Sequence, residues 1–206
     1  MELLYRISKG ILYPFESAWH RYFRVEGKEN VPREGPLIAA IDEHGHFFDP
    51  VHVAVKYPRI LHFMATKYLF ETPIIRKLAR WFGAYPVDRL NLKPSTIRES
   101  LDILKEGEAL GIFITGTTKQ YRSDGITPVS PKGGAAGIAL KAVEKGIPVK
   151  ISPVLLEGTR DMYQCGGRMP FRRRLRMKVG ETIDPSEFDS VDELTDAIWN
   201  SIQELK

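Results

Sequence analysis

The chain has 206 residues, of which 43% are hydrophobic and 27% are charged, and its formal net charge at pH 7 is +4. This length and composition indicate one globular domain with a sizeable core. A single cysteine, Cys165, excludes a disulfide framework and suits a reducing compartment. We expect no signal peptide and no transmembrane helix, because no uncharged run approaches the roughly 18 residues that span a bilayer.

Residues 1–24 form the first predicted element, an amphipathic helical segment. Apolar side chains recur about every four residues from Leu3 to Phe23, basic residues flank this stripe, and Pro14 is expected to kink the helix. Aromatic, apolar and basic residues together are typical of a helix at a membrane surface. The alternative is a helix that packs against its own domain, and one helix pair can do both.

Residues 25–206 then alternate between strand-like and helical patterns, as expected for one α/β domain without internal linkers. Strands are predicted at 35–41, 60–66, 84–89, 108–115 and 147–156, and an edge strand at 175–183. Helices are predicted at 49–57, 72–83, 94–107 (with Ser95 as its cap) and 132–146, and a last one after a capping box of Ser190 and Glu193. This alternation predicts an α/β fold, a mostly parallel sheet flanked by helices.

Charge is unevenly distributed toward the C-terminus. The stretch RMPFRRRLRMK at 168–178 is strongly basic, whereas the last 23 residues are acidic. Such a basic run attracts anionic lipid headgroups, a nucleotide carrier, an acidic protein or nucleic acid, or it is simply a solvated strand edge. We do not expect nucleic acid, because the run lacks interleaved aromatic residues and a recognisable motif.

The stretch DEHGHFFDP, residues 42–50, holds the most informative pattern. His44 and His46 can together bind a metal, but few histidines remain as a third ligand and none follows His62. Asp49 and Pro50 form a good helix start, which explains them without any function. The third interpretation is a His44–Asp49 dyad at the carboxyl end of a strand, in which the carboxylate orients an imidazole that takes a proton from a substrate hydroxyl.

The pattern His44-x4-Asp49-Pro50 after a strand resembles the first motif of the glycerolipid acyltransferases, the 1-acylglycerol-3-phosphate acyltransferase (PlsC) family. Further similar motifs follow in the order of that family: VEGKENVPREGPLIAAI at 25–41, GAYPVDR at 83–89, GIFITGTTK at 111–119, DGITPVSPKGGAAGIA at 124–139, GIPVKISPV at 146–154 and VGETIDPSEF at 179–188. The resemblance covers roughly residues 20 to 190.

This resemblance implies roles for individual residues. His44 would be the base that deprotonates the acceptor hydroxyl, Asp49 its orienting carboxylate, and Arg89 a contact for the acceptor phosphate. Residues 147–149 would help to shape the acyl pocket. The acyl group would come from acyl-CoA or an acyl-carrier protein as co-substrate, and no metal or other cofactor is implied.

The third motif departs from the family pattern FPEGTRS. Ile114, Thr115 and Thr118 replace its proline, glutamate and arginine, while Gly116 and Thr117 are retained. We expect Thr115, Gly116 and Thr117 still to contact substrate, and the lost cation to be replaced by one of three basic residues: Lys119, Arg122 or Lys132.

Two further observations bear on the motifs. Glu43 and His46 stand where the family has asparagine and serine around the base. The sequence EGTR at 157–160 is not the third motif, because it follows the segment 147–149 instead of preceding it.

The sequence therefore predicts an O-acyltransferase, peripheral or monotopic at the cytoplasmic face of an anionic membrane, that acylates a lysophospholipid or another lipid alcohol. The altered third motif leaves a second interpretation open, a lipid-binding relative that does not turn its ligand over. A metal-dependent hydrolase that uses His44 and His46 is the third interpretation.

Overall fold

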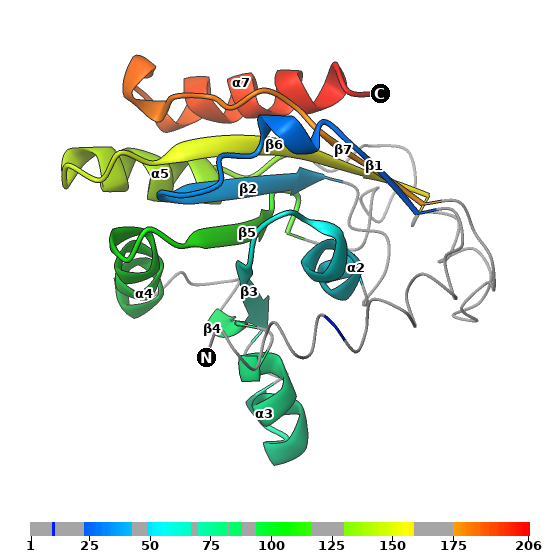
Figure 1. The fold of residues 1–206 in the computed structure, drawn as a ribbon. Coiled ribbons are helices and arrows are strands. Elements are labelled where there is room, and N and C mark those ends of the chain that lie inside the picture. Colours follow the sequence, from blue (N-terminus) through cyan, green and yellow to red (C-terminus); the bar gives the residue numbers. More distant parts are fainter. Residues whose placement is uncertain are drawn as a thin grey trace.

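The computed structural model describes Gly10 and residues 23–42, 49–66, 70–81, 83–87, 94–116, 130–158 and 175–206. These segments form a seven-stranded sheet in the order β1-β7-β6-β2-β5-β3-β4 (Figure 1). The strands are β1 (Arg24–Glu26), β2 (Leu37–Asp42), β3 (Leu61–Thr66), β4 (Tyr85–Val87), β5 (Ala109–Phe113), β6 (Lys150–Glu157) and β7 (Arg176–Val179). The helices are α2 (Asp49–Lys56), α3 (Pro73–Trp81), α4 (Pro94–Lys105), α5 (Gly134–Glu144) and α7 (Val191–Gln203), with short 3-10 helices η1 (Lys28–Asn30) and η3 (Pro185–Glu187).

The sheet is mostly parallel, which confirms the predicted fold class. β6, β2, β5, β3 and β4 all run in one direction. β7 pairs antiparallel with β6, and β1 pairs parallel with β7, so these two strands run the opposite way. Five strands consequently end at the same edge of the sheet.

Two predicted details are wrong. The strand at β7 is not an edge strand, because β1 pairs with it in the register Arg24↔Arg176 and takes the edge position itself. β1 has only three residues, too few to show an alternating pattern in the sequence. The second error is the cap of α4: the helix begins at Pro94, whose fixed φ suits a first helical position, so Ser95 lies inside the helix.

Apolar residues of β2 divide the core into two layers. Ile38 and Ala40 point to one face, where they pack with residues of α4, α5 and α7. Leu37, Ala39 and Ile41 point to the other face, where they pack with residues of α2. Figure 1 accordingly shows α7 and α2 on opposite sides of the sheet, while α3 stands apart beyond β4.

The N-terminal segment 1–24 lies almost entirely outside the described residues, so its helical, membrane-surface character and its boundary stay predictions. Within the described ranges, no helix is both long enough and apolar enough to cross a bilayer. The predicted capping box at the start of α7 shows one of its two hydrogen bonds: the Glu193 N–H donates to Ser190 Oγ over 3.2 Å.

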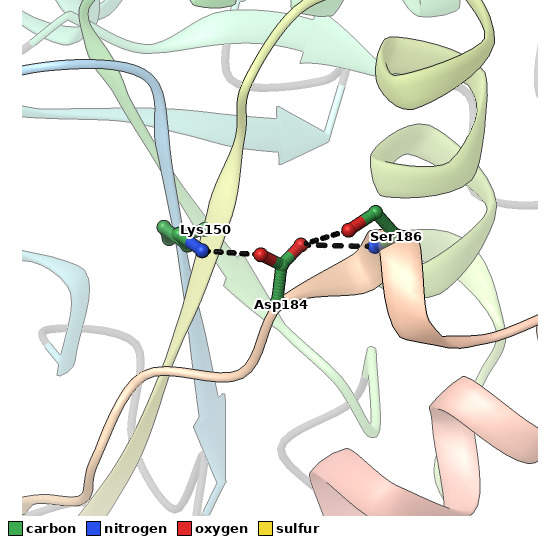
Figure 2. A network of polar contacts seen from close by, with 3 residues as sticks. All are labelled: Lys150, Asp184 and Ser186. Carbon is green, nitrogen blue, oxygen red and sulfur yellow. Dashed lines mark hydrogen bonds and ion pairs between the residues drawn. The ribbon is translucent and has the colours of Figure 1, made fainter.

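A polar network joins the start of β6 to η3 (Figure 2). Lys150 Nζ donates to Asp184 Oδ2, and the Asp184 Oδ1 atom accepts from the Ser186 hydroxyl at 2.7 Å and from its backbone N–H at 3.0 Å. The hydrogen bond from Lys150, together with those from Ser186, lowers the pKa of Asp184 to about 2. The network holds the chain after β7 against the sheet, and it is followed by α7, which packs on β6.

We predict that this network stabilises the fold only where Asp184 is ionised. The pKa of this carboxyl is lowered in the folded state, so its contribution is complete above the unfolded value of about 3.9 and is lost as the pH falls toward 2. In urea unfolding, Asp184→Asn should be less stable than the wild type at pH 7, and the two should converge between about pH 4 and pH 2. Asp189→Asn, at an exposed position nearby, is the control and should show no such convergence; a deficit of Asp184→Asn that persists at pH 2 would contradict the prediction.

Gly111 offers a test of the packing at the centre of the sheet. It lies opposite Phe63 on β3, and a Cβ added to it would come within 2.5 Å of Phe63 Cε1. Phe63 is buried and stacks on Phe113 with 6.2 Å between ring centroids, so the ring has little room to move. We expect Gly111→Ala to lower the free energy of unfolding by about 1–3 kcal/mol in urea titrations. The control Gly137→Ala, within α5 and with open space around its Cβ position, should instead raise it by up to about 1 kcal/mol.

Candidate functional site

The predicted site residues all follow the carboxyl ends of parallel strands. His44 and Asp49 come after β2, and Arg89 comes two residues after the end of β4. The remaining candidates lie between β5 and α5: Thr115, Gly116, Thr117, Lys119, Arg122 and Lys132. In open α/β sheets, binding sites form at this edge.

Four of these candidates lie in the part of the chain that the structure describes: Asp49, Thr115, Gly116 and Lys132. The other five lie outside it: His44, Arg89, Thr117, Lys119 and Arg122. The His44–Asp49 contact, the hydrogen bonds of the base and the surroundings of Arg89 are therefore predictions that no described contact tests.

The position along this edge that best suits a binding site lies between β2 and β5. These strands are neighbours in the register Ile41↔Phe113, and the Ile114 N–H donates to the Ile41 carbonyl oxygen over 3.0 Å. After β2 the chain continues into α2 on one face of the sheet, whereas after β5 it continues into α5 on the other face. Adjacent strands whose connections leave to opposite faces form a topological switch point, where a crevice opens between the two connections.

Asp49 occupies the first position of α2 and has no exposed surface. The predicted range of this helix begins at Asp49 and that start is confirmed, although Pro50 is the second helical residue and not the first; a carboxylate in the first turn is stabilised by the helix dipole. Asp42, at the end of β2, is also buried, with 5% of its surface exposed. The segment 43–48 that contains His44 is thus bounded on both sides by a buried carboxyl group.

Asp42 had no predicted role, although the sequence carries a signal for it. It ends a strand, LIAAID, whose other residues are apolar, and every residue of this strand is buried. A carboxyl group at the end of an otherwise apolar, buried strand is costly to bury unless it is hydrogen-bonded or paired with a charge, so its presence there is a signal in the sequence.

The position of α2, and with it that of Asp49, is held by a buried hydrogen bond at the far end of the helix. The Tyr57 hydroxyl donates to Ser152 Oγ over 3.0 Å, which connects the residue after α2 to β6. Burial raises the pKa of Tyr57 to about 12, so the phenol stays protonated and remains a donor. Ser152 pairs with Ala39 in the sheet, so this bond fixes α2 directly against the central strands.

Thr115, Gly116 and Lys132 are brought together by the turn that follows β5. The Gly116 N–H donates to the Phe113 carbonyl over 3.0 Å, and the Lys132 N–H donates to the Ile114 carbonyl over 2.8 Å. The chain therefore leaves this turn after Gly116 and returns to it at Lys132. Thr115 is buried, with 8% of its surface exposed.

The side chain of Lys132 lies beside the glycine of this turn. Its Nζ and Cδ atoms are each 3.4 Å from the position that a Cβ on Gly116 would occupy. Gly116 has a φ of 64°, a conformation that favours glycine. Among the three basic residues predicted to replace the lost arginine, Lys132 is thus the one that the described structure places at the third motif.

Two other histidines lie in the described ranges, His62 in β3 and His52 in the first turn of α2. His62 is near the amino end of β3, and its Nε2 atom contacts the carboxylate of Glu108, which directly precedes β5. His52 is buried in α2, with its ring centroid 6.4 Å from that of Phe23. In the described ranges no group of three histidine, cysteine, aspartate or glutamate side chains is placed to hold a metal ion.

The second EGTR sequence remains separate from the third motif, as predicted. Its Glu157 ends β6, on the other side of β2 from β5. The carboxylate of Glu157 accepts from Lys178 Nζ over 3.2 Å, so it pairs with β7.

Three comparisons relate this site to known proteins. The model of the family described as Acyltransferase matches residues 22–175. A 1-acyl-sn-glycerol-3-phosphate acyltransferase of Bacillus subtilis (strain 168) is 29% identical over 191 residues, which cover 89% of this chain and 87% of the relative. The protein of the same name from Streptococcus pneumoniae (strain ATCC BAA-255 / R6) is 30% identical over 179 residues, or 85% of this chain, and the match spans only 61% of that relative.

A solved structure supports the same fold. The crystal structure of the 1-acyl-sn-glycerophosphate (LPA) acyltransferase PlsC from Thermotoga maritima matches with a TM-score of 0.73 and 24% identity, covering 97% of this chain and 78% of that one. The family match includes β2, the turn after β5 and β6, which together form the carboxyl edge described above. The protein is therefore a member of the acyltransferase family, similar to O-acyltransferases of the PlsC kind.

Proposed function

We propose that this protein transfers a fatty acyl group from an acyl thioester, either acyl-CoA or an acyl-carrier protein, to the free hydroxyl of a lysophospholipid such as 1-acylglycerol-3-phosphate. The observation that carries this proposal is the switch point between β2 and β5, because the first and third motifs of the family both follow strands that end there. The names of the relatives support the same acceptor class.

The proposed chemistry is general base catalysis by His44. Its neutral imidazole takes the proton of the acceptor hydroxyl while the hydroxyl oxygen attacks the thioester carbonyl, and the same proton is then available to the departing thiolate. An ester bond forms and the thioester bond breaks, so no protein nucleophile and no metal or other cofactor is required.

Buried carboxylates support this role for His44. It follows Asp42, whose side chain is buried, by two residues in the chain. Asp49 is fully buried five residues further on. A nearby negative charge favours the imidazolium form, and a carboxylate that accepts from one ring nitrogen leaves the other free to act as base.

Acceptor recognition is proposed to rest on Arg89 and Lys132. A guanidinium binds phosphate in a bidentate manner, whereas an ammonium group supplies a point charge. Lys132 lies at the turn where the family pattern has its arginine, and its side chain is exposed and available to an anion. Thr115 and Thr117 offer hydroxyl groups in the same turn, with Lys119 and Arg122 as further cations.

We predict that His44→Ala lowers acyl-transfer turnover by about 100- to 10,000-fold, the usual contribution of a general base. The measurement is product formation from acyl-CoA and acyl-carrier protein with a panel of lysolipids that carry or lack a phosphate. The urea midpoint should stay at the wild-type value. Turnover of His44→Ala near that of the wild type would rule out the base role.

His46→Ala is the matched control, because it removes the neighbouring histidine and should keep most of the activity. Equal losses in both variants, together with stoichiometric zinc in the purified protein, would favour the metal-dependent hydrolase instead. A wild-type protein that binds lysolipid but forms no product with either donor would favour the non-catalytic lipid-binding relative.

We further propose that the protein works at the cytoplasmic face of an anionic membrane and contacts it with α3 as well as with the predicted segment 1–24. Ile74 in α3 is a bulky apolar residue with 73% of its surface exposed. Arg76, Lys77 and Arg80 on the same helix are exposed cations. A short helix with these side chains that stands apart from the sheet suits the headgroup region of a bilayer (Figure 1).

We predict that Ile74→Ser weakens sedimentation with vesicles of phosphatidylglycerol and phosphatidylcholine, because a buried isoleucine contributes about 1.5–3 kcal/mol to insertion. Val191→Ser is the control: Val191 is also a bulky apolar residue with an exposed side chain, at 38%, but it lies at the start of α7. Equal vesicle binding by the wild type and both variants would exclude α3 as a contact.

A further inference from the structure

We propose that the groove between α4 and α5 is the docking site for an acidic helix of the carrier protein that delivers the acyl thioester. This inference rests on the proposed function, and it selects one of the two donor classes named there. The groove is a hollow of about 450 Å³ lined by residues of α4 and α5, and none of the candidate site residues lines it.

The floor of the groove is apolar and its rims are basic. Ile97 and Leu101 of α4 line it and are part of the core layer beneath. The charged residues that line it are Arg98, Asp102, Lys105, Lys141 and Lys145. The lining of the groove therefore contains four cations and one acid.

Three acids in or next to these helices do not line the groove: Glu99 in α4, Glu106 directly after α4 and Glu144 in α5. Asp102, the acid that does, lies 4.0 Å from Lys105. In the described part of the chain neither Lys141 nor Lys145 forms an ion pair, so the α5 rim keeps its full positive charge.

The concave shape favours a protein helix over a lipid surface. A membrane is contacted by protruding apolar side chains, such as the highly exposed Ile74, whereas Leu101 is recessed, with only 6% of its surface exposed. An amphipathic helix can lower apolar side chains into a groove while its acidic side chains meet cations on both rims. α4 has 12 residues and is about 18 Å long, enough to accompany three to four turns of such a helix.

The helix ends argue against a compact phosphate, such as those of coenzyme A, as the occupant. Lys105 and Lys141 lie in the last turns of α4 and α5, and Lys145 is the C-cap residue of α5. The carbonyl groups at helix C-termini give this region a partial negative charge, which opposes a concentrated anion. The carboxylates of a partner helix are instead spread along its length. They can therefore meet the ends of the lysine side chains at a greater distance from the carbonyl groups at the helix C-termini.

The test is the double charge reversal Lys141→Glu/Lys145→Glu, assayed with palmitoyl-acyl carrier protein and with palmitoyl-CoA. We expect KM for the carrier-protein donor to rise at least about tenfold with kcat unchanged, since removal of complementary charge weakens association. The KM for palmitoyl-CoA should stay within about twofold of the wild-type value. Glu144→Lys, on the same helix but outside the groove, is the control and should not raise either KM.

Direct titration of the variants with acyl-free carrier protein separates this inference from the proposed function. Weaker binding by the double variant supports the groove even if the wild type forms no product, a result that would overturn only the proposed function. Acyl transfer by the wild type with unchanged carrier-protein KM and binding in the double variant would overturn only the groove. An equal rise of KM for both donors would also overturn it, since coenzyme A lacks the acidic helix.

Discussion

β2 is hydrogen-bonded to β5 on one side and to β6 on the other, and all six of its residues are buried. A strand in this position can carry no functional side chain along its length, because both faces are occupied by core packing. Polar residues can enter only where the strand ends. The buried carboxyl group of Asp42 at the end of β2 and the turn after β5 therefore lie at the same edge of the sheet, and the first and third motifs of the family follow these two strands in the chain.

The connections after β2 and β5 lead to opposite faces of the sheet, because α2 packs on one face and α5 on the other. The bond between Tyr57 and Ser152 keeps α2 against the central strands, and the return of the chain to Lys132 closes the turn after β5. The third motif departs from the family pattern at this edge, with the buried Thr115 in place of an acid and with Lys132 beside Gly116.

The elements around the site were largely predictable because each carries a local signal. The apolar run at β2, the Asp-Pro start of α2 and the glycine after α3 depend on residues adjacent in the chain. β1 was not predictable, since three residues show no period and the pairing with β7 depends on a segment about 150 residues away. The error at Ser95 has a local cause: a serine and a proline both favour the start of α4, and proline takes the first position.

The sequence by itself determined the α/β class, the chain positions of the motifs and the residue types that point to base chemistry, because helix and strand periods and motif spacing are properties of neighbouring residues. Only the tertiary structure decided that β5 lies beside β2, that Lys132 returns to Gly116, and that lysines of α5 face an apolar groove of α4. These relations join segments far apart in the chain, and they are set by which apolar faces can be buried together, a choice that no local pattern contains.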